Sequence, residues 1–429
     1  MVIQPNIKDV KTANVVMLHY ITASILFLVI CCLVLFSYQS FIGHYFHPKL
    51  LAITHITTLG WISMVIIGSL YQLAPVISNS KLFSLKLAQV SYLLILIGTI
   101  MLAYCFWQFN VGYLLQATSS LLFIGISLFT FNIFLTTNKA DEKNIESDFL
   151  VSSVIWFWMT VFLGVLLAFN FRYTFLPKEH IYFLKIHAHI GLVGWFLCLI
   201  IGVASRLVPM FLISGKLNKK LLNYAYYLLN VGLLGFIIDS IFFNGINRSF
   251  IYVIPIVISL GLFLTYIKEA YQNRLKKNLD IGLKHTFISF ILIIIPVSIW
   301  VILKTIITDE KIKNQLSITL TFSILFGFIS LLILGQTFKN LAFISWLKNY
   351  QNYSGNAQAP LPKDIYSESI ANIQLYAFLA GFLTALTGII VSCENLILIG
   401  AICLIVAAVL YNINVFKIVF HKRKSLIIK

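Results

Sequence analysis

The chain has 429 residues, of which 60% are hydrophobic and only 10% are charged, and its mean hydropathy is +0.94. These values exclude a water-soluble globular protein and predict a polytopic membrane protein. A net charge of +17 would suggest nucleic-acid binding in a soluble domain, but here the basic residues fall in short loops, as in membrane proteins. We therefore expect the lipid bilayer as a partner and no nucleic acid.

Twelve apolar stretches follow one another along the chain, each long enough to cross a bilayer as a helix. No connection is large enough to fold as a soluble domain, so we expect an all-α bundle that forms a single transmembrane domain over residues 1–429. The longest connections are 136–148 and 339–371, and the second is expected to be an irregular loop. The expected spans lie approximately at 14–37, 50–76, 87–108, 112–135, 149–171, 181–213, 221–242, 249–268, 285–306, 315–338, 372–392 and 395–417.

Lysine and arginine are distributed unevenly between the two sides of this arrangement. If the N-terminus is inside, the inner segments hold 22 of these residues and the outer loops hold 8. The positive-inside rule then predicts an integral, multi-pass protein of the plasma (inner) membrane with both termini cytoplasmic. The first span follows a polar stretch of about fourteen residues, so no signal peptide is expected.

An internal repeat runs through the second, sixth and tenth spans. Twice in the chain, 134 residues apart, a histidine is followed by glycine at +5, tryptophan at +6, glycine at +13 and proline at +20. A third copy begins at Phe322 and keeps both glycines without the histidine. The twelve spans thus form three pseudo-repeats of four helices, at about 14–135, 149–268 and 285–417. The matched residues are His55, Gly60, Trp61, Gly68 and Pro75, and His189, Gly194, Trp195, Gly202 and Pro209.

The repeat also predicts how its helices face their neighbours. On an α-helix the glycines and the proline share a face that lies roughly opposite the histidine. Small residues on that face allow another helix to approach closely, while the imidazole points into the bundle. Twenty residues of helix rise about 30 Å, so the histidines lie near the outer surface and the prolines near the inner one.

The histidines of the second and sixth spans are the main candidates for function. A histidine inside a membrane is costly unless it is paired or ligated, and imidazole commonly ligates haem iron and copper. His55 and His189 occupy the same depth, which suits two ligands of one centre. The alternative is that each donates to a carbonyl and only fixes helix packing. His187 lies about 200° around the helix from His189, so it addresses a second centre or bonds locally.

The other histidines and the cysteines are weaker candidates for a functional site. His44, His47 and His180 fall in or beside outer loops, where solvated side chains are the ordinary outcome, and His19, His285 and His421 are expected to be interfacial. Six cysteines without a CxxC pair are expected to serve in packing.

Two charged residues lie within or at the end of a span. Arg206 is expected to reach the inner headgroups. Asp239 is expected to pair with Arg172, Lys178 or Lys185, cations that could equally neutralise haem propionates.

Twelve spans in three four-helix units, with histidines on the second and sixth, resemble subunit I of the haem–copper oxidases and nitric oxide reductases. The architectural likeness covers the whole chain, whereas the likeness in residues is limited to the HxxxxGW…G…P units at 55–75 and 189–209. The resemblance implies that His55 corresponds to a low-spin haem ligand. It also implies that His187 or His189 corresponds to the copper ligand of the sixth span.

The chain departs from that family at positions that matter for chemistry. The tenth span has no histidine, and Phe322 occupies the repeat position, while the seventh span lacks a histidine pair. Neither the paired low-spin haem nor the binuclear centre can be built as in the family. The resemblance therefore implies fold and ancestry, and we expect no catalytic residues and no reduction of oxygen or nitric oxide.

Our first hypothesis is a diverged, non-catalytic member of this superfamily that retains one haem or metal centre near the outer face. Its ligands would be His55 and His189, with His187 next in line, and haem b is the expected occupant. Such a protein would serve in electron transfer, in haem or nitric oxide sensing, or as part of a larger respiratory assembly.

Two further hypotheses remain open. In the first alternative, the chain handles copper for other metal-handling membrane subunits, and its outer histidines capture the metal. Its low methionine content, six residues, weighs against a Cu(I) site. The second alternative is a scaffold that has lost every cofactor and keeps its histidines for packing. The copper-capturing residues would be His44, His47, His55, His187 and His189.

Overall fold

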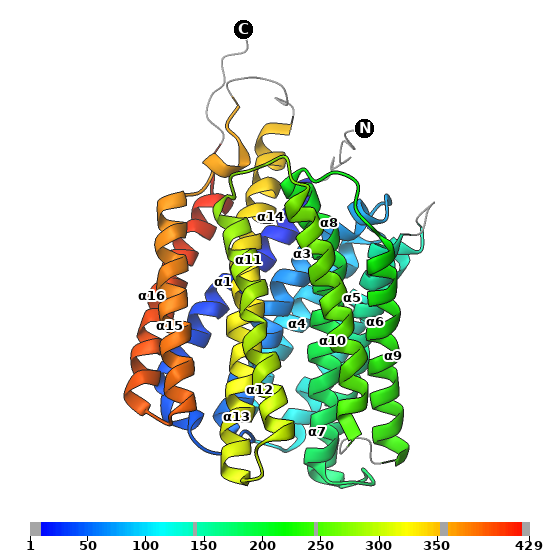
Figure 1. The fold of residues 1–429 in the computed structure, drawn as a ribbon, viewed down its shortest axis with the longest axis vertical. Helices are drawn as coiled ribbons and strands as arrows, with labels where there is room; N and C mark the ends of the chain where they lie inside the picture. Colours follow the sequence, from blue (N-terminus) through cyan, green and yellow to red (C-terminus); the bar gives the residue numbers. More distant parts are fainter. Residues whose placement is uncertain (1–9, 140–143, 244–247, 352–358, 423–429) are drawn as a thin grey trace. The chain divides into compact units, whose positions relative to one another are not determined.

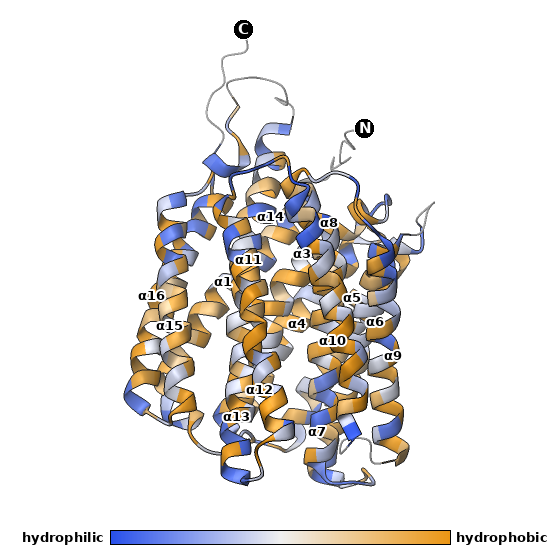
Figure 2. Ribbon diagram, viewed as in Figure 1, coloured by the Kyte–Doolittle hydropathy of each residue, from blue (hydrophilic) through white to orange (hydrophobic). Residues whose placement is uncertain are grey.

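The computed structural model describes residues 10–139, 144–243, 248–351 and 359–422. Within these ranges, twelve helices are long and apolar enough to cross a membrane. The expected all-α architecture of a polytopic membrane protein is therefore confirmed at this level. The middle turns of the helices are mostly hydrophobic, and hydrophilic residues gather toward the helix ends (Figure 2). This distribution is the one that a bilayer requires.

Most spans are a single α-helix, and four are built from two (Figure 1). The second, sixth and tenth spans each contain a π-helical segment between two α-helices, and the ninth joins α11 to α12. The α-helices are α1 Val10–Phe36, α2 Pro48–His55, α3 Met64–Ile77, α4 Leu85–Trp107, α5 Tyr113–Thr137, α6 Ile145–Tyr173, α7 His180–His189, α8 Cys198–Leu212, α9 Lys220–Phe243, α10 Ser249–Gln272, α11 Ile281–Leu292, α12 Ile294–Thr305, α13 Glu310–Phe322, α14 Leu331–Tyr350, α15 Glu368–Ile390 and α16 Glu394–Val419.

Eleven of the expected spans agree with the structure to within four residues at either end. The exception is the tenth, which runs from Glu310 to Tyr350, so the expectation of an irregular loop from residue 339 was wrong for its first twelve residues. Polar residues interrupt the hydropathy there, but α14 continues because it buries one side of its last turns, where the Ser345 hydroxyl donates to the carbonyl of Ile418. Residues 352–358 and 140–143 of the two long connections lie outside the described residues.

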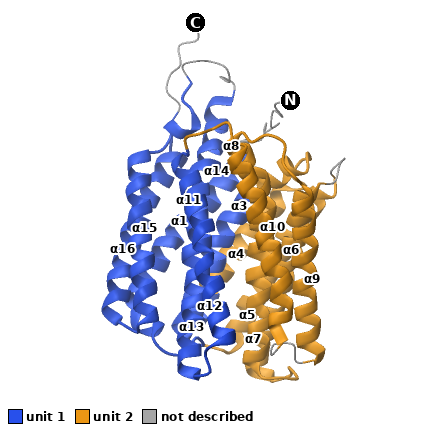
Figure 3. Ribbon diagram, viewed as in Figure 1, with its two compact units in different colours: residues 1–69, 102–109, 279–429 blue, residues 70–101, 110–278 orange. Residues whose placement is uncertain are grey.

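The chain divides into two compact units, coloured in Figure 3. Unit 1 comprises residues 1–69, 102–109 and 279–429, and unit 2 comprises residues 70–101 and 110–278. In unit 1, α15 pairs with α16, α1 packs on α16, and α11 packs on α14. In unit 2, α9 pairs with α10, and α6 packs on both α5 and α8.

The second glycine of the repeat permits a close helix contact in unit 1. A Cβ atom added to Gly68 would lie 2.6 Å from the Cβ of His19 on α1. One added to Gly335 would lie 2.4 Å from the Cβ of His285 on α11. Real Cβ atoms do not approach so closely, so only glycine fits at these positions.

Unit 2 contains the same contact and a second one beside it. A Cβ on Gly202 would lie 2.5 Å from the Cβ of Phe149 on α6. Eight residues further along α6, Phe157 stacks on Trp195 with ring centroids 4.3 Å apart. The close-packed face that the repeat predicts is thus confirmed for this copy, and an aromatic stack holds it in place.

The first copy repeats that stack. Phe27 lies eight residues after His19 on α1, and its ring stacks on Trp61 with centroids 4.6 Å apart. The glycine and the tryptophan of the first and second copies therefore meet side chains at matching positions on the helix that precedes them in the chain.

The π-helical segments occupy identical positions in the three copies. They are η2 Ile56–Ser63, η3 Ile190–Leu197 and η5 Ser323–Ser330, each of eight residues and each starting one residue after the repeat position. A π-helix bonds residue i to i+5 and is rare in proteins. The α-helical spacing that the sequence analysis assumes for the repeat is therefore interrupted in each of these spans. The third copy keeps the π-helical segment without the histidine, so the segment does not depend on the imidazole.

Candidate functional site

His55 is the last residue of α2 in unit 1 and directly precedes η2. Its Nδ1 lies 2.8 Å from the carbonyl oxygen of Leu51, and its ring stacks on Phe106 with centroids 4.6 Å apart. A carbonyl can only accept, so Nδ1 carries the proton and Nε2 carries the lone pair. Histidines that bind a metal through Nε2 have this same arrangement, with Nδ1–H donated to a carbonyl.

His189 has the same geometry in unit 2, where it is the last residue of α7 and directly precedes η3. Its Nδ1 donates to the carbonyl of Lys185 over 2.7 Å, again four residues earlier. Its ring lies against Phe236 of α9, with centroids 5.0 Å apart, and the residue is partly buried. Both candidate ligands therefore have the same tautomer and the same place on their helices.

His187 faces a different helix from His189, as their spacing predicts. Its Nδ1 donates over 2.9 Å to the carbonyl of Thr160 on α6. Its Cε1 lies 3.1 Å from the position of a Cβ on Gly164, also on α6. The sequence left two roles open for His187, a second metal centre or a local hydrogen bond. The structure shows the local hydrogen bond, which joins α7 to α6.

The loop histidines have the opposite tautomer. Nδ1 of His44 accepts from the backbone N–H of Phe46 over 3.0 Å, and Nδ1 of His47 accepts from that of Lys49 over 3.3 Å. The second bond makes His47 the N-cap of α2. Accepting through Nδ1 uses the lone pair that a metal would need, so these contacts do not favour the predicted copper capture. Nδ1 of His180 likewise accepts from Asn170, over 3.4 Å.

Electrostatics favour the capping role of His47. Partial burial, followed by the nearby ammonium group of Lys49, lowers the pKa of His47 below its ordinary value. The neutral ring is the form that can accept at Nδ1, so the environment of His47 and its hydrogen bond are consistent with each other.

The expectation that His19 and His285 are interfacial was wrong, since both are fully buried. Each donates from Nδ1 over 2.8 Å to the carbonyl four residues earlier. His19 packs on Gly68 and His285 packs on Gly335, the second glycines of two repeat copies. These contacts keep both rings away from water, although both residues lie near the ends of their spans. The signal was their spacing, since the two histidines precede those glycines by 49 and 50 residues.

The ion pair expected of Asp239 forms with a residue that the sequence did not suggest. Its Oδ1 lies 2.6 Å from Nη2 of Arg248, which also donates to the carbonyl of Phe243 at the end of α9. Of the cations expected to pair with it, Arg172 stacks on the ring of Tyr113, and Lys178 donates to the carbonyl of Ser240. The Asp239 expectation was thus wrong in its partner.

Arg206, which the sequence predicts to reach the headgroups, is exposed. None of the six cysteines, all of which lie in the described ranges, forms a disulfide. Over the described residues, neither unit holds three or more His, Cys, Asp or Glu side chains grouped so as to bind a metal ion. The ligation chemistry available at the predicted site is therefore that of individual imidazoles, chiefly His55 and His189.

No protein-family model matches this chain, and no curated protein matches it.

Proposed function

We propose that this protein is a diverged, non-catalytic relative of subunit I of the haem–copper oxidases and nitric oxide reductases that binds a b-type haem. The observation that carries the proposal is the combination of position and tautomer that His55 and His189 share. Both end an α-helix directly before a π-helical segment, and both donate Nδ1–H to the carbonyl four residues back. This places the lone pair on Nε2, the atom that ligates haem iron.

The donor set fits haem better than copper. A haem would need one or two imidazoles from the protein because the porphyrin supplies the other ligands of its iron, whereas a copper site would need several protein ligands together. When bound, haem would supply one-electron transfer or reversible binding of a diatomic gas such as nitric oxide. His187 has the same tautomer, but its ring faces α6 rather than α9, the helix that His189 faces, so we place it second.

The third copy of the repeat supports a structural role for the tenth span. Phe322 stands where the other copies have histidine, is 4% exposed, and stacks on Phe326 and Phe382. An aromatic cluster therefore occupies the repeat position of this span, where the proposed relationship would call for a ligand. We propose that reduction of oxygen or nitric oxide was lost with those ligands and that the three-copy architecture remained.

The proposed setting is the plasma (inner) membrane with both termini in the cytoplasm, because lysine and arginine are concentrated in the inner segments. His55 and His189 would then lie toward the outer side. A haem there suits electron exchange or gas sensing at that surface, alone or with respiratory or metal-handling membrane subunits.

The test is the optical spectrum of the purified full-length protein, oxidised and dithionite-reduced, after expression with ample haem. We expect sharp Soret and α bands of a b-type haem in the reduced state. His55→Ala and His189→Ala should each abolish or alter these bands. His44→Ala and His47→Ala, whose Nδ1 atoms accept backbone hydrogen bonds, are the matched controls and should leave the bands unchanged.

The outcomes separate the three hypotheses. Haem that stays unchanged in both His55→Ala and His189→Ala would make the ligand assignment wrong. A protein without haem that co-purifies with stoichiometric copper under reducing conditions would support copper handling. Absence of both, with lower thermal stability in His55→Ala, would leave a scaffold whose histidines serve packing.

A further inference from the structure

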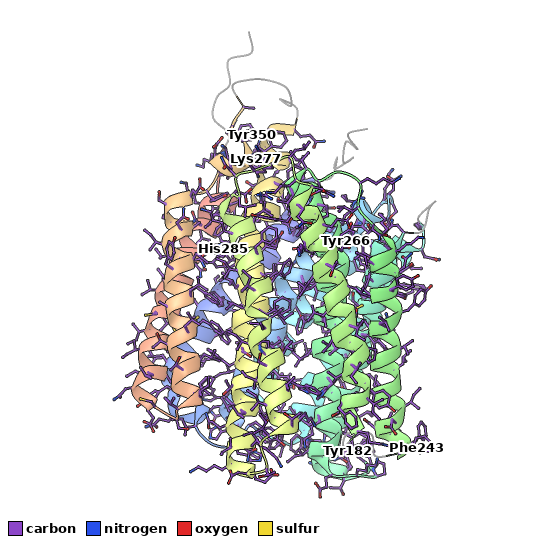
Figure 4. The ribbon with its side chains drawn as sticks, viewed as in Figure 1. Tyr182, Phe243, Tyr266, Lys277, His285 and Tyr350 are labelled. Atoms are coloured by element: carbon purple, nitrogen blue, oxygen red, sulfur yellow. The ribbon has the colours of Figure 1, made fainter. Side chains whose placement is uncertain are left out.

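Three helices of unit 1 enclose polar side chains that the proposed haem site does not use. His285 on α11 is fully buried, and its Nδ1 donates to the carbonyl of Ile281. It lies in the half of unit 1 nearer to Tyr350 (Figure 4). Gln374 on α15 is also fully buried and interacts with the ring of His285. Gln336 on α14 donates over 2.7 Å to the hydroxyl of Thr286, the residue after His285.

Several polar atoms of this group form no hydrogen bond of ordinary geometry with any described residue. They are His285 Nε2, both amide atoms of Gln374, and Gln336 Oε1. Buried polar atoms are almost always hydrogen-bonded, to protein or to ordered water. Several such atoms together on neighbouring helices indicate a shared partner rather than separate defects.

The donors and acceptors of this group match a water molecule. Because Nδ1 of His285 carries the proton, its Nε2 is an acceptor. Gln374 offers one acceptor, Oε1, and one donor group, while Gln336 Oε1 is an acceptor. A water molecule donates two hydrogen bonds and accepts two, and buried waters typically make about three. Water can therefore donate to His285 and to either glutamine oxygen while it accepts from the amide of Gln374.

The group lies close to the end of α11, where water is available. Asp280 caps that helix, and its carboxylate pairs with the ammonium group of Lys339. The two side chains are 20% and 14% exposed, so both reach the surface. His285 follows Asp280 by five residues, a rise of about 7.5 Å. The methylene chain of Lys339 lies over Gly282 between them, with Cγ 3.0 Å from the position of an added Cβ.

The geometry points to a water-binding site enclosed by α11, α14 and α15. Ordered water in it joins Nε2 of His285 to the amide of Gln374 and the carbonyl of Gln336. This water exchanges with the aqueous phase beside the Asp280–Lys339 ion pair. The site holds water inside a membrane-spanning bundle, and it does not depend on haem.

Deuterium exchange at the Cε1 position of histidine, followed by mass spectrometry of the full-length protein in D2O, tests this inference. The exchange requires water at the ring. We expect His285 to exchange measurably over a period in which the exposed His44 exchanges fully. Gln374→Leu removes both amide atoms at similar size, and it should slow exchange at His285 by about tenfold or more, because the water loses a donor and an acceptor.

Gln116→Leu is the matched control. Gln116 is 5% exposed on α5 of unit 2, its Nε2 also has no hydrogen-bond partner among the described residues, and its loss should leave His285 unchanged. The inference is overturned if His285 does not exchange in the unaltered protein. It is also overturned if Gln374→Leu folds, leaves the rate unchanged and raises thermal stability, as expected when unsatisfied atoms are removed from a dry core. If Gln374→Leu does not fold, the rate in the unaltered protein decides.

Discussion

The indole nitrogen of Trp61 donates a hydrogen bond of 3.0 Å to the hydroxyl of Ser330, and both residues are fully buried in unit 1. Trp61 belongs to the first copy of the repeat, and Ser330 is the last residue of η5 in the third. The bond therefore joins two π-helical segments that are 269 residues apart in the chain. Since neither group reaches water, the loss of one would leave the other unsatisfied.

Trp61→Phe should lower the free energy of unfolding in detergent by about 1–3 kcal/mol, because Ser330 loses its donor and the smaller ring packs less well. Ser330→Ala should cost a similar amount by leaving the indole N–H without an acceptor. The double variant should cost less than the sum of the two. Strict additivity would show that the bond contributes nothing to stability.

Gly335→Ala and Gly202→Ala should destabilise the protein by about 1–3 kcal/mol or more, because the new methyl group would overlap a neighbouring Cβ. The matched control is Gly261→Ala on α10, where nothing lies within 4 Å of the added atom. That change should be neutral or stabilising by up to about 1 kcal/mol, from helix propensity alone. Thermal midpoints in the same detergent measure the difference. Equal effects at Gly261 and Gly335 would contradict the close contact.

His47 should make the start of α2 sensitive to mild acid. Its pKa is lowered in the folded protein, so the unfolded chain binds more protons below about pH 6.5 and folded-state stability falls as the pH decreases through that range. Protonation also places a hydrogen on Nδ1, which then cannot accept from the backbone N–H of Lys49.

Amide hydrogen exchange at Lys49 and Leu51, after correction for intrinsic rates, should therefore speed up between pH 7 and pH 5. His47→Asn keeps a capping side chain without a titratable ring and should show no such dependence. An unchanged pH profile in His47→Asn would assign the effect to another group.

His187→Ala should lower stability without removing haem. It deletes the hydrogen bond to Thr160 and the ring that packs on Gly164, at a cost of about 1–3 kcal/mol. The thermal midpoint and the reduced spectrum, measured on the same sample, separate this role from ligation. Loss of the haem bands with an unchanged midpoint would make His187 a ligand and reverse the assignment.

The spans were predictable because hydropathy reports the helix segments in contact with lipid. The same measure ended the tenth span too early. The last turns of that span lie beyond its apolar run, and contacts within the protein, such as that of Ser345 with Ile418, continue α14 there. Polar residues at Lys339 and Asn340 end an apolar run, but they do not end a helix that neighbouring helices support.

The sequence could identify the candidate residues of the site, but it could not give the protonation of their rings. The repeat identified His55 and His189 from the sequence alone. Sequence spacing cannot reveal which ring nitrogen holds the proton, and that property separates them from His44 and His47. The burial of His285 likewise depends on the glycine that it meets, 50 residues later in the chain.

The number of residues in a π-helical segment determines which way the side chains of the following α-helix point. A hydrogen-bonded turn of π-helix holds one more residue than a turn of α-helix, and one residue corresponds to about 100° of rotation. A deletion of one residue within η5 could restore α-helical winding, yet it would rotate all of α14 by about that angle. Gly335 would then turn away from His285, and Ser345 from Ile418. Substitutions in these segments should therefore be tolerated more readily than any change in their length.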